Sequence, residues 1–590
     1  MKIKNLFLSS LLSLFGFNYL YSQEIRDTTK TYEFPEIEIT ASYINTKEQE
    51  ISRIEPRTSS FKTIYNNDLF KSLEGTTRIA PFISKPQVRS LTLDEFGGIW
   101  WKNIELIGPI TQSLGLISNI NENIMYVELL KNSSISYNNI GSSIELKPKK
   151  YEGNDLEIKA FTDFLNRTIT LSNPIRGENV NGFTAVGLRN IYAPRIMEAF
   201  EILPFAMDFQ SYSNLDINLL GKDIKIEAFT RNSKEYNNVN QSTDYGKLEV
   251  FQDYKQNLAI LSLEVPFNGI KLAANLGYED FVLFKDEDFG SLGNELDMKA
   301  KKREINFELS ENNPKHDRYS VSATKSFIES DKSDDLELLR LWIRTKNEFG
   351  KFLFTFGTSL TRYNEQTEPG YEAILDYYLD NVKISLGHNY LINYLIHNDG
   401  YVVNLKNPQK SSNYFLSLEF KEEDEEIKFN FFKKHFTASY FRGKQEESRG
   451  NIYGSEIHLS GRNVFIDNLD NLVSLYFSQS EIDAHYLPGA FDFGMQIDLT
   501  YHDLLPGLNI VLQGDYKNGF YYNVKGTDIY LKAPYTLYLN FGLEKDFGNF
   551  NFALGIMDIP LFEHKNMVAF NKVPIYSRTY GNFGITYNFN

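Results

Sequence analysis

The chain has 590 residues, a formal net charge of −16 and no cysteine. The lack of cysteine excludes disulfides, thiolate metal sites and lipid attachment through an N-terminal cysteine. The acidity argues against nucleic acid or an anionic lipid surface as the partner. Aromatic residues make up 15% of the chain although its mean hydropathy is −0.37. This combination favours an outer-membrane β-barrel, in which aromatic girdles coexist with strands of alternating polarity.

The N-terminal residues 1–22 are predicted to be a signal peptide, so that the mature chain is exported. Lys2 and Lys4 precede an apolar run over 6–17, and Ser22 stands at the expected cleavage point. A membrane anchor is the weaker alternative, because the run is shorter than the roughly 18 residues that a helical span needs. Residues 23–45 are polar, contain an isolated strand-like run over 36–40 and predict a periplasmic segment.

Residues 46–150 are predicted to form a small α/β domain. A short helix is expected over Asn67 to Glu74, where Asp68 is a candidate N-cap and apolar residues line one face. The strands expected after it are Val88 to Leu91, Ile99 to Trp101, Ile104 to Ile107, Met125 to Leu130 and Ser143 to Lys147. Lys102 and Asn103 are expected to form a two-residue turn, at which Gly would be the more usual residue.

From residue 151 to the C-terminus the pattern becomes that of a long antiparallel sheet. In Phe352, Phe354 and Phe356 the apolar residues alternate with small or polar ones, and Leu537 to Leu543 repeats the pattern. A period of two places each set on its own side of a sheet. Because the second set is mostly Thr, Ser, Asn and Gly rather than charged, it is typical of a barrel lumen.

The connections indicate about 22 strands between Leu156 and Phe589. Tight turns are predicted at 221–223, 267–269, 349–351, 379–381, 422–426, 506–507 and 546–549, and longer polar loops at 192–211, 233–255, 285–302, 397–412, 518–533 and 559–574. Short turns on one side and long loops on the other are typical of a transmembrane barrel. The even count requires one long strand over Ile427 to Arg442, and it places the acidic turn Glu422 to Glu426 on the periplasmic side.

A sheet in lipid cannot keep an unpaired edge, so these strands must close into a ring. A ring of about 22 strands is too wide for its own side chains to fill, and large barrels of this kind are plugged. The sequence therefore predicts a membrane all-β protein, in which an N-terminal α/β plug (46–150) lies inside a β-barrel (151–590).

On these features the chain resembles the TonB-dependent outer-membrane receptors, which lie in the outer membrane of Gram-negative bacteria. The matching runs are Glu36 to Ala41, Ala80 to Phe82, Val88 to Ser90, Ile124 to Asn132, Tyr137 to Asn138, Gly141 and Ile144 to Leu146. The resemblance implies a TonB-binding strand at Glu36, Ile37, Glu38, Ile39 and Thr40, plug–barrel contacts at Arg89 and Glu128, and an assembly signal at Phe583, Ile585, Tyr587 and Phe589. It also implies the TonB complex and the outer-membrane assembly machinery as partners, together with a small ligand or partner proteins.

Several family glycines are replaced in this chain. Ser90 follows Arg89, Asn132 follows Lys131, Lys102 and Asn103 replace the usual Asp-Gly turn, and Ser142 and Ser143 replace a Gly pair. Gly reaches backbone angles that Ser and Lys reach only at a cost of about 1 kcal/mol or more. The plug loops are therefore expected to differ from the usual ligand-facing surface.

No pattern predicts catalysis, a cofactor or a metal, so the chain is not expected to be an enzyme. The eight histidines are scattered from His316 to His564 without the spacing of a zinc site. The acidic residues at 286–288, 295 and 297 are either a calcium loop or, as the preferred interpretation, a solvated extracellular loop. No serine-histidine-aspartate set, phosphate loop or paired-carboxylate motif is specific enough to propose catalysis, and a barrel protease or lipase stays an alternative only because such sites are built from dispersed residues.

Three functions follow as hypotheses. The first is TonB-dependent import of a scarce ligand across the outer membrane. The second is a non-transporting plugged barrel that serves as a structural subunit of an outer-membrane assembly or secretion complex; the replaced glycines favour it, whereas the intact run over 36–41 favours the importer. The third is an open, porin-like channel.

Overall fold

The fold is taken from a computed structural model of the chain. It describes residues 51–53, 76–77, 87–89, 91–92, 98–106, 124–137, 139 and 141–148. Within 156–589 it describes every residue except 163–165, 193–201, 220, 244–245, 290–291, 312–317, 332–334, 364–365, 399–400, 423–424, 439–446, 463–465, 484, 487–491, 519–520, 524–529, 533–534 and 563–579.

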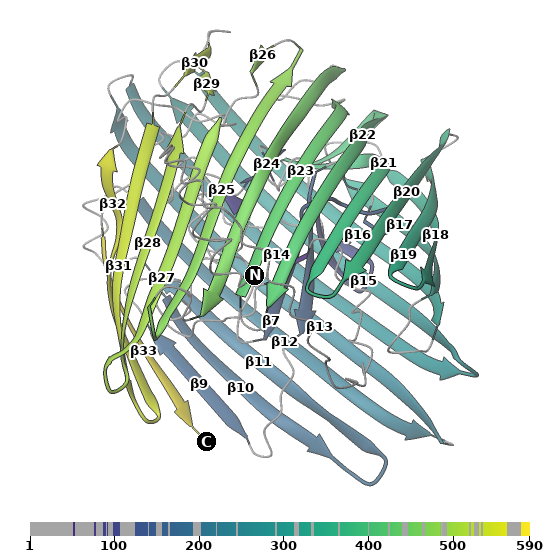
Figure 1. The fold of residues 1–590 in the computed structure, drawn as a ribbon, viewed down its shortest axis with the longest axis horizontal. Helices are drawn as coiled ribbons and strands as arrows, with labels where there is room; N and C mark the ends of the chain where they lie inside the picture. The colour runs from purple at the N-terminus through teal and green to yellow at the C-terminus, as the bar shows by residue number, and fades with distance from the viewer. Residues whose placement is uncertain are drawn as a thin grey trace, which may run out of the picture.

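The strands after residue 156 form a closed antiparallel barrel (Figure 1). Its first half comprises β9 (Glu157–Thr162), β10 (Asn166–Arg176), β11 (Val180–Tyr192), β12 (Ile202–Leu219), β13 (Lys222–Thr243), β14 (Gly246–Phe267), β15 (Ile270–Phe289), β16 (Leu292–Glu311), β17 (Tyr319–Ser330), β18 (Leu336–Phe349) and β19 (Phe352–Tyr363). Its second half comprises β20 (Gln366–Leu379), β21 (Val382–Asn398), β22 (Tyr401–Glu422), β23 (Glu425–Ala438), β24 (Ser448–Arg462), β25 (Leu469–Ile482), β27 (Phe493–Leu505), β28 (Leu508–Asn518), β31 (Tyr535–Phe547), β32 (Phe550–Phe562) and β33 (Tyr580–Phe589).

The ring closes where β33 pairs with β9, from Ile585 opposite Thr162 to Phe589 opposite Ile158. The barrel therefore has 22 strands, as the sequence predicts. The two-residue β26 (His485–Tyr486) is not counted, because it pairs with the end of β25 and β25 itself pairs directly with β27. The short strands β29 (Tyr521–Asn523) and β30 (Tyr530–Lys532) form a separate hairpin.

The predicted alternation along the barrel strands is confirmed. In β19, Phe352, Phe354, Phe356 and Leu360 are exposed on the outer side of the barrel, and the odd-numbered residues from 353 to 361 are buried. Other strands show the same alternation, and Leu, Ile, Phe and Tyr side chains are exposed on strands around the barrel. Exposed apolar side chains around the whole ring are what a barrel in hydrocarbon presents.

The tight turns lie at one end of the barrel and have the predicted residues. Asn268 and Gly269 have φ values of 47° and 81°, the left-handed geometry of a two-residue hairpin turn. Gly221, Gly350, Gly507 and Gly548 likewise have positive φ values. The acidic turn lies at the same end, between Glu422 of β22 and Glu425 of β23.

Three of the predicted long loops are wrong, and a fourth, 192–211, is wrong over 202–211, which belong to β12. The polar segments 233–255, 285–302 and 397–412 continue the hairpins β13–β14, β15–β16 and β21–β22, whose strands are 17 to 22 residues long. A polar strand that rises above the lipid has no apolar face, and its sequence therefore looks like a loop. The single strand expected over Ile427 to Arg442 is β23, which runs from Glu425 to Ala438.

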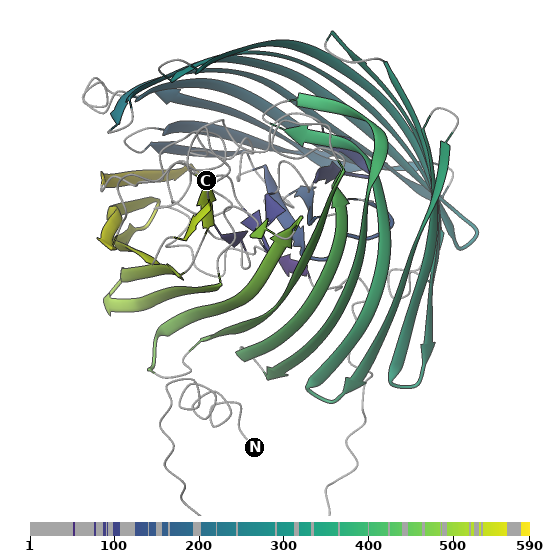
Figure 2. The ribbon, with the colours of Figure 1, turned by 90° about the horizontal axis from the view of Figure 1, so that it is seen from above.

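The short N-terminal strands lie inside the ring (Figure 2). One sheet has the order β1-β7-β8-β5-β6, with β1 (Ile51–Arg53), β5 (Gly98–Trp101), β6 (Ile104–Leu106), β7 (Met125–Leu130) and β8 (Ser143–Pro148). A smaller sheet contains β2 (Thr76–Thr77), β3 (Gln87–Val88) and β4 (Leu91–Thr92). β5 to β8 agree with the predicted strands, but the single strand predicted over Val88 to Leu91 is wrong, because Arg89 forms a turn between β3 and β4. The fold is the predicted plugged barrel.

Several sequence predictions lie outside the described residues. They are the signal peptide 1–22, the TonB-binding strand 36–40, the helix Asn67 to Glu74 and the plug–barrel boundary at residue 150. Among the residues that the structure describes, no helix is long and apolar enough to cross a membrane.

Candidate functional site

The contacts between plug and barrel form the candidate site. The first of them begins at Arg89, which lies in the tight turn between β3 and β4 with a φ of 50°. Its guanidinium donates from Nε and Nη2 to the two carboxylate oxygens of Glu456 on β24, both at 3.1 Å. Nη1 donates to Asn132 of the plug at 2.5 Å, and the guanidinium lies 4.3 Å from the centre of the Phe432 ring. This two-point ion pair is the strong form of an arginine–carboxylate contact.

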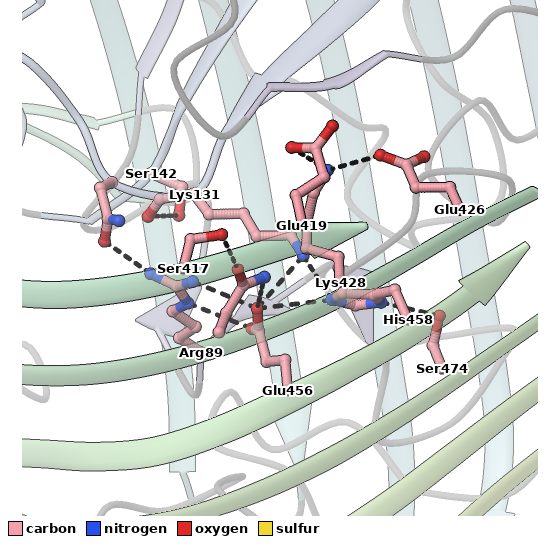
Figure 3. Close-up of polar contacts among 12 residues, drawn as sticks. Arg89, Lys131, Ser142, Ser417, Glu419, Glu426, Lys428, Glu456, His458 and Ser474 are labelled. Carbon is pink, nitrogen blue, oxygen red and sulfur yellow. Dashed lines mark hydrogen bonds and ion pairs between the residues drawn. The ribbon is translucent and has the colours of Figure 1, made fainter. Parts of the chain in front are cut away.

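A second plug cation reaches the same carboxylate. Lys131 Nζ lies 3.2 Å from Glu456 Oε2 and 2.8 Å from His458 Nε2 (Figure 3). His458 Nδ1 lies 3.0 Å from Ser474 Oγ, so a neutral ring can accept from Lys131 and donate to Ser474. Asn430 also donates to Glu456, at 3.3 Å. We call Arg89, Lys131, Glu456 and His458 the β24 contact.

All four groups of the β24 contact are buried, with side chains 1–4% exposed. Two cations share one carboxylate there, and the removal of that carboxylate would leave both cations buried without the negative charge that they share. Breaking a buried ion pair in this way costs several kcal/mol.

The second contact is made by the predicted turn at Lys102 and Asn103, whose φ values are 52° and 63°. Lys102 Nζ lies 2.5 Å from Glu227 on β13 and 2.7 Å from Glu264 on β14. Asn103 Nδ2 donates to Glu308 of β16 at 2.6 Å. The turn thus joins the plug to three barrel strands near their tight-turn end, and we call it the β13–β16 contact.

The charge of Lys102 is fixed by its surroundings. Burial lowers the pKa of Lys102, but the carboxylates of Glu264 and Glu227 raise it, and the resulting pKa lies well above the ordinary value. The ammonium group therefore stays protonated, and it neutralises two carboxylates that would otherwise repel each other.

Next to this turn the plug backbone itself is held. Lys302 of β16 donates to the carbonyl of Glu105 at 2.5 Å, and the Glu105 amide donates to Glu304 at 3.2 Å. Ile104 packs directly over Gly277 of β15, where an added methyl group would lie only 2.7 Å from the isoleucine.

An apolar cluster joins the plug sheet to the same side of the barrel. Its plug members are Ile99, Trp101, Ile104, Leu106, Ile124, Met125, Leu129, Ile144 and Leu146, and its barrel members are Phe183, Ala185, Tyr212, Phe229, Leu258 and Ile260 on β11–β14. The Trp101 and Phe229 rings are 6.1 Å apart. Burying these groups stabilises the contact by roughly 25 cal/mol per Å² of apolar surface.

The loop between β7 and β8 contacts a third part of the wall. Ile135 packs against Trp342 of β18 and Leu391 of β21, and its amide donates to Glu372 of β20 at 3.2 Å. Asn389 of β21 donates to the carbonyl of Ser133 at 2.6 Å.

Of the two predicted plug–barrel contact residues, Arg89 meets Glu456 of the barrel. Glu128 lies 4.0 Å from Lys147, a plug residue. Burial lowers the pKa of Lys147, and Glu145 and Glu128 raise it to a net value above the ordinary one.

Of the predicted assembly signal, Phe583 is exposed on the outer side and Tyr587 packs on Phe550, with ring centres 4.3 Å apart. Ile585 is half-buried, and Phe589 pairs through its backbone with Ile158.

Sequence reasoning missed Lys102, Lys131, Glu456 and His458 as contact residues. Alternation along β24 places Glu456 and His458 on the lumen face, where a charged residue among Ser and Gly is a detectable signal. The partners are up to 367 residues apart in sequence, so the pattern alone does not pair them.

Comparison with solved structures bears on this arrangement. The ferric-catecholate import receptor Fiu from E. coli aligns with 92% of this chain and 98% of its own, at 11% identity and a TM-score of 0.72. The FrpB iron transporter from Neisseria meningitidis aligns over 91% and 99%, at 11% identity and a TM-score of 0.67. The ferripyoverdine receptor of the outer membrane of Pseudomonas aeruginosa aligns over 90% and 85%, at 11% identity and a TM-score of 0.67.

The fold is that of the TonB-dependent outer-membrane receptors. No protein-family model and no curated protein matches the sequence. The receptor fold extends over plug and barrel together, because the alignments cover at least nine tenths of this chain.

In the part of the chain that the structure describes, no group of three or more His, Asp and Glu side chains is placed to hold a metal ion. The acidic residues 286–288, 295 and 297 lie on the β15–β16 hairpin, where Asp286 pairs with Glu295 across the strands.

Proposed function

We propose that this chain is a TonB-dependent receptor that imports a scarce ligand across the outer membrane. The observation that carries the proposal is a plug that is held inside a 22-stranded barrel by polar contacts. Ion pairs between plug and wall keep the channel shut at rest, and they can be exchanged for water when the plug is pulled.

The ligand class to test first is a ferric chelate. The solved neighbours are named for ferric catecholate, for ferripyoverdine and for iron transport. A ferric chelate is too large and too dilute for passive diffusion to supply enough of it, which is the condition under which a plugged and energised barrel is useful.

We propose that TonB pairs with the strand Glu36 to Thr40 by strand addition. Main-chain hydrogen bonds along such a pair transmit a pull without requiring particular side chains. Arg89 and Glu128 are proposed to hold the plug against the wall until that pull arrives.

The test is uptake of radiolabelled ferric citrate, a ferric catecholate and a ferric hydroxamate by iron-starved cells that carry this receptor alone. Ile39→Pro removes a backbone donor from the strand and should abolish energised uptake, while Ile39→Val keeps the donor and should preserve it. Uptake at the wild-type level in Ile39→Pro would overturn the proposed coupling.

The structural-subunit hypothesis stays as a second candidate because one observation favours it. The Lys102 turn replaces the usual Asp-Gly turn and adds a cation that bonds two barrel carboxylates, which fastens the plug more firmly. A stable stoichiometric set of partner proteins at native expression level, without uptake of any ferric chelate, would favour this function over import.

A further inference from the structure

We infer that the passage opens between the plug and the wall β22–β25, while the plug stays fastened to β13–β16. The inference deepens the proposed function by naming the side of the plug that moves. It rests on an asymmetry between the β24 contact and the β13–β16 contact.

The two contacts lie on opposite walls. Nine strands separate β14 from β24 in one direction around the barrel, and ten separate β24 from β13 in the other. Release of one of these two contacts, with the other kept, opens a path along one wall only.

The β13–β16 contact combines charge with apolar burial. Lys102 and Asn103 bond three carboxylates there, and Trp101 and Ile104 belong to the apolar cluster on the same wall. Water can solvate a separated ion pair, but it cannot replace an apolar contact. Release on this side exposes both kinds of group.

The β24 contact is polar. Arg89 and Lys131 meet one carboxylate, and within the described residues the apolar cluster contains no residue of β22–β25. Each group of the β24 contact is one that water solvates well, so this side has the smaller cost of opening.

Beside the β24 contact, three phenylalanine rings of the wall lie over glycines of a neighbouring strand. Phe415 lies over Gly387, Phe432 over Gly454 and Phe436 over Gly450, each pair directly opposite across two strands. A Cβ at any of these glycines would overlap the facing ring. Glycine therefore allows the rings to lie flat along the wall instead of standing into the lumen.

On the side of β21, this stretch of wall ends where the plug packs against the barrel again. There Ile135 packs against Trp342 and Leu391, on β18 and β21. The Phe432 ring carries the Arg89 guanidinium at rest, and departure of Arg89 would leave an open aromatic face along the passage.

Two buried serines provide a matched test, since the natural chain has no cysteine. Ser474 on β25 lies beside the β24 contact and Ser262 on β14 lies beside the β13–β16 contact, and both are fully buried. The variants Ser474→Cys and Ser262→Cys are made separately in the full chain, reconstituted in phospholipid vesicles and exposed to a maleimide at increasing urea concentrations below barrel unfolding.

The expected result is that Ser474→Cys is labelled about tenfold faster than Ser262→Cys at low urea, because local opening follows the weakest contacts. Faster labelling of Ser262→Cys, or equal rates, would overturn the inference. If either variant fails to form a barrel by circular dichroism, Ser417→Cys on β22 or Ser310→Cys on β16, both at buried serines, replaces it as the reporter of the same side.

The purified protein contains no TonB, so this result is independent of the proposed coupling. Faster labelling of Ser474→Cys together with normal uptake in Ile39→Pro would support the opening side and overturn TonB coupling. The reverse pair of results would overturn the opening side alone.

Discussion

The two walls that hold the plug are built on different physical principles. The β13–β16 wall joins an ammonium group and two carboxylates to an apolar cluster, whereas the β24 wall has a carboxylate shared by two cations next to a histidine. The first contact is costly to separate, because water can solvate its charges but cannot replace its apolar packing. The second depends on exact pairing of buried charges and fails when one of them is lost. The difference shows how one plug can be both firmly seated and removable.

The three tryptophans of the chain make this comparison measurable. Trp100, Trp101 and Trp342 are all buried, and each contacts a residue at the plug–barrel interface. Detachment of the plug by urea should therefore shift their fluorescence to longer wavelength before the barrel unfolds.

The largest effect is expected for Glu456→Gln. The change removes the negative charge that Arg89 and Lys131 share in a buried site and should weaken plug attachment by about 4 kcal/mol. The urea midpoint of the tryptophan transition should fall accordingly. Glu447→Gln, which alters an exposed pair with Arg449, serves as the control and should leave the midpoint unchanged.

A somewhat smaller effect is expected for Lys102→Met. The apolar cluster remains, but Glu227 and Glu264 lose the cation between them, which should cost about 3 kcal/mol. Lys325→Met removes a similar lysine from an exposed pair with Glu337 and is the matched control. An unchanged midpoint in Lys102→Met would show that the turn does not fasten the plug.

The apolar share of the β13–β16 contact is tested by Ile104→Val. Loss of one methylene group over Gly277 should cost about 1 kcal/mol. Ile343→Val, on the outer face of β18, is the control. A cost equal to that of Lys102→Met would mean that packing over Gly277 matters as much as the charges do.

The smallest expected effect is the coupling free energy between substitutions on the two walls. Residues on opposite walls share no partner, so the effects of Lys102→Met and Glu456→Gln should add to within about 0.5 kcal/mol. A larger coupling in the double variant would show that the plug transmits strain between the contacts and that they are not separate fastenings.

The sequence predicts the barrel well because the lipid imposes a strict period of two on every spanning strand. Phe352 to Leu360 shows the pattern, and the structure confirms it. The same logic fails at 233–255 and 285–302, where the hairpins continue with polar residues on both faces and no lipid enforces the alternation.

The candidate site is harder to predict from sequence. The turn at Lys102 is predicted from local chemistry, but its partners lie 125 and 162 residues away and are chosen by how the plug sits in the ring. Glu456 stands out as a charge on a lumen face, yet its two cations come from separate plug turns. Pairing of this kind is a property of the assembled lumen.

The central claim is that the residues before 150 close an otherwise open barrel. Single-channel recording in planar bilayers tests it directly, with the intact mature chain compared with a variant that lacks residues 46–150. The account predicts a silent intact protein and large, stable conductance steps from the variant. Steps of the same size from both proteins would contradict the plug and favour an open, porin-like channel.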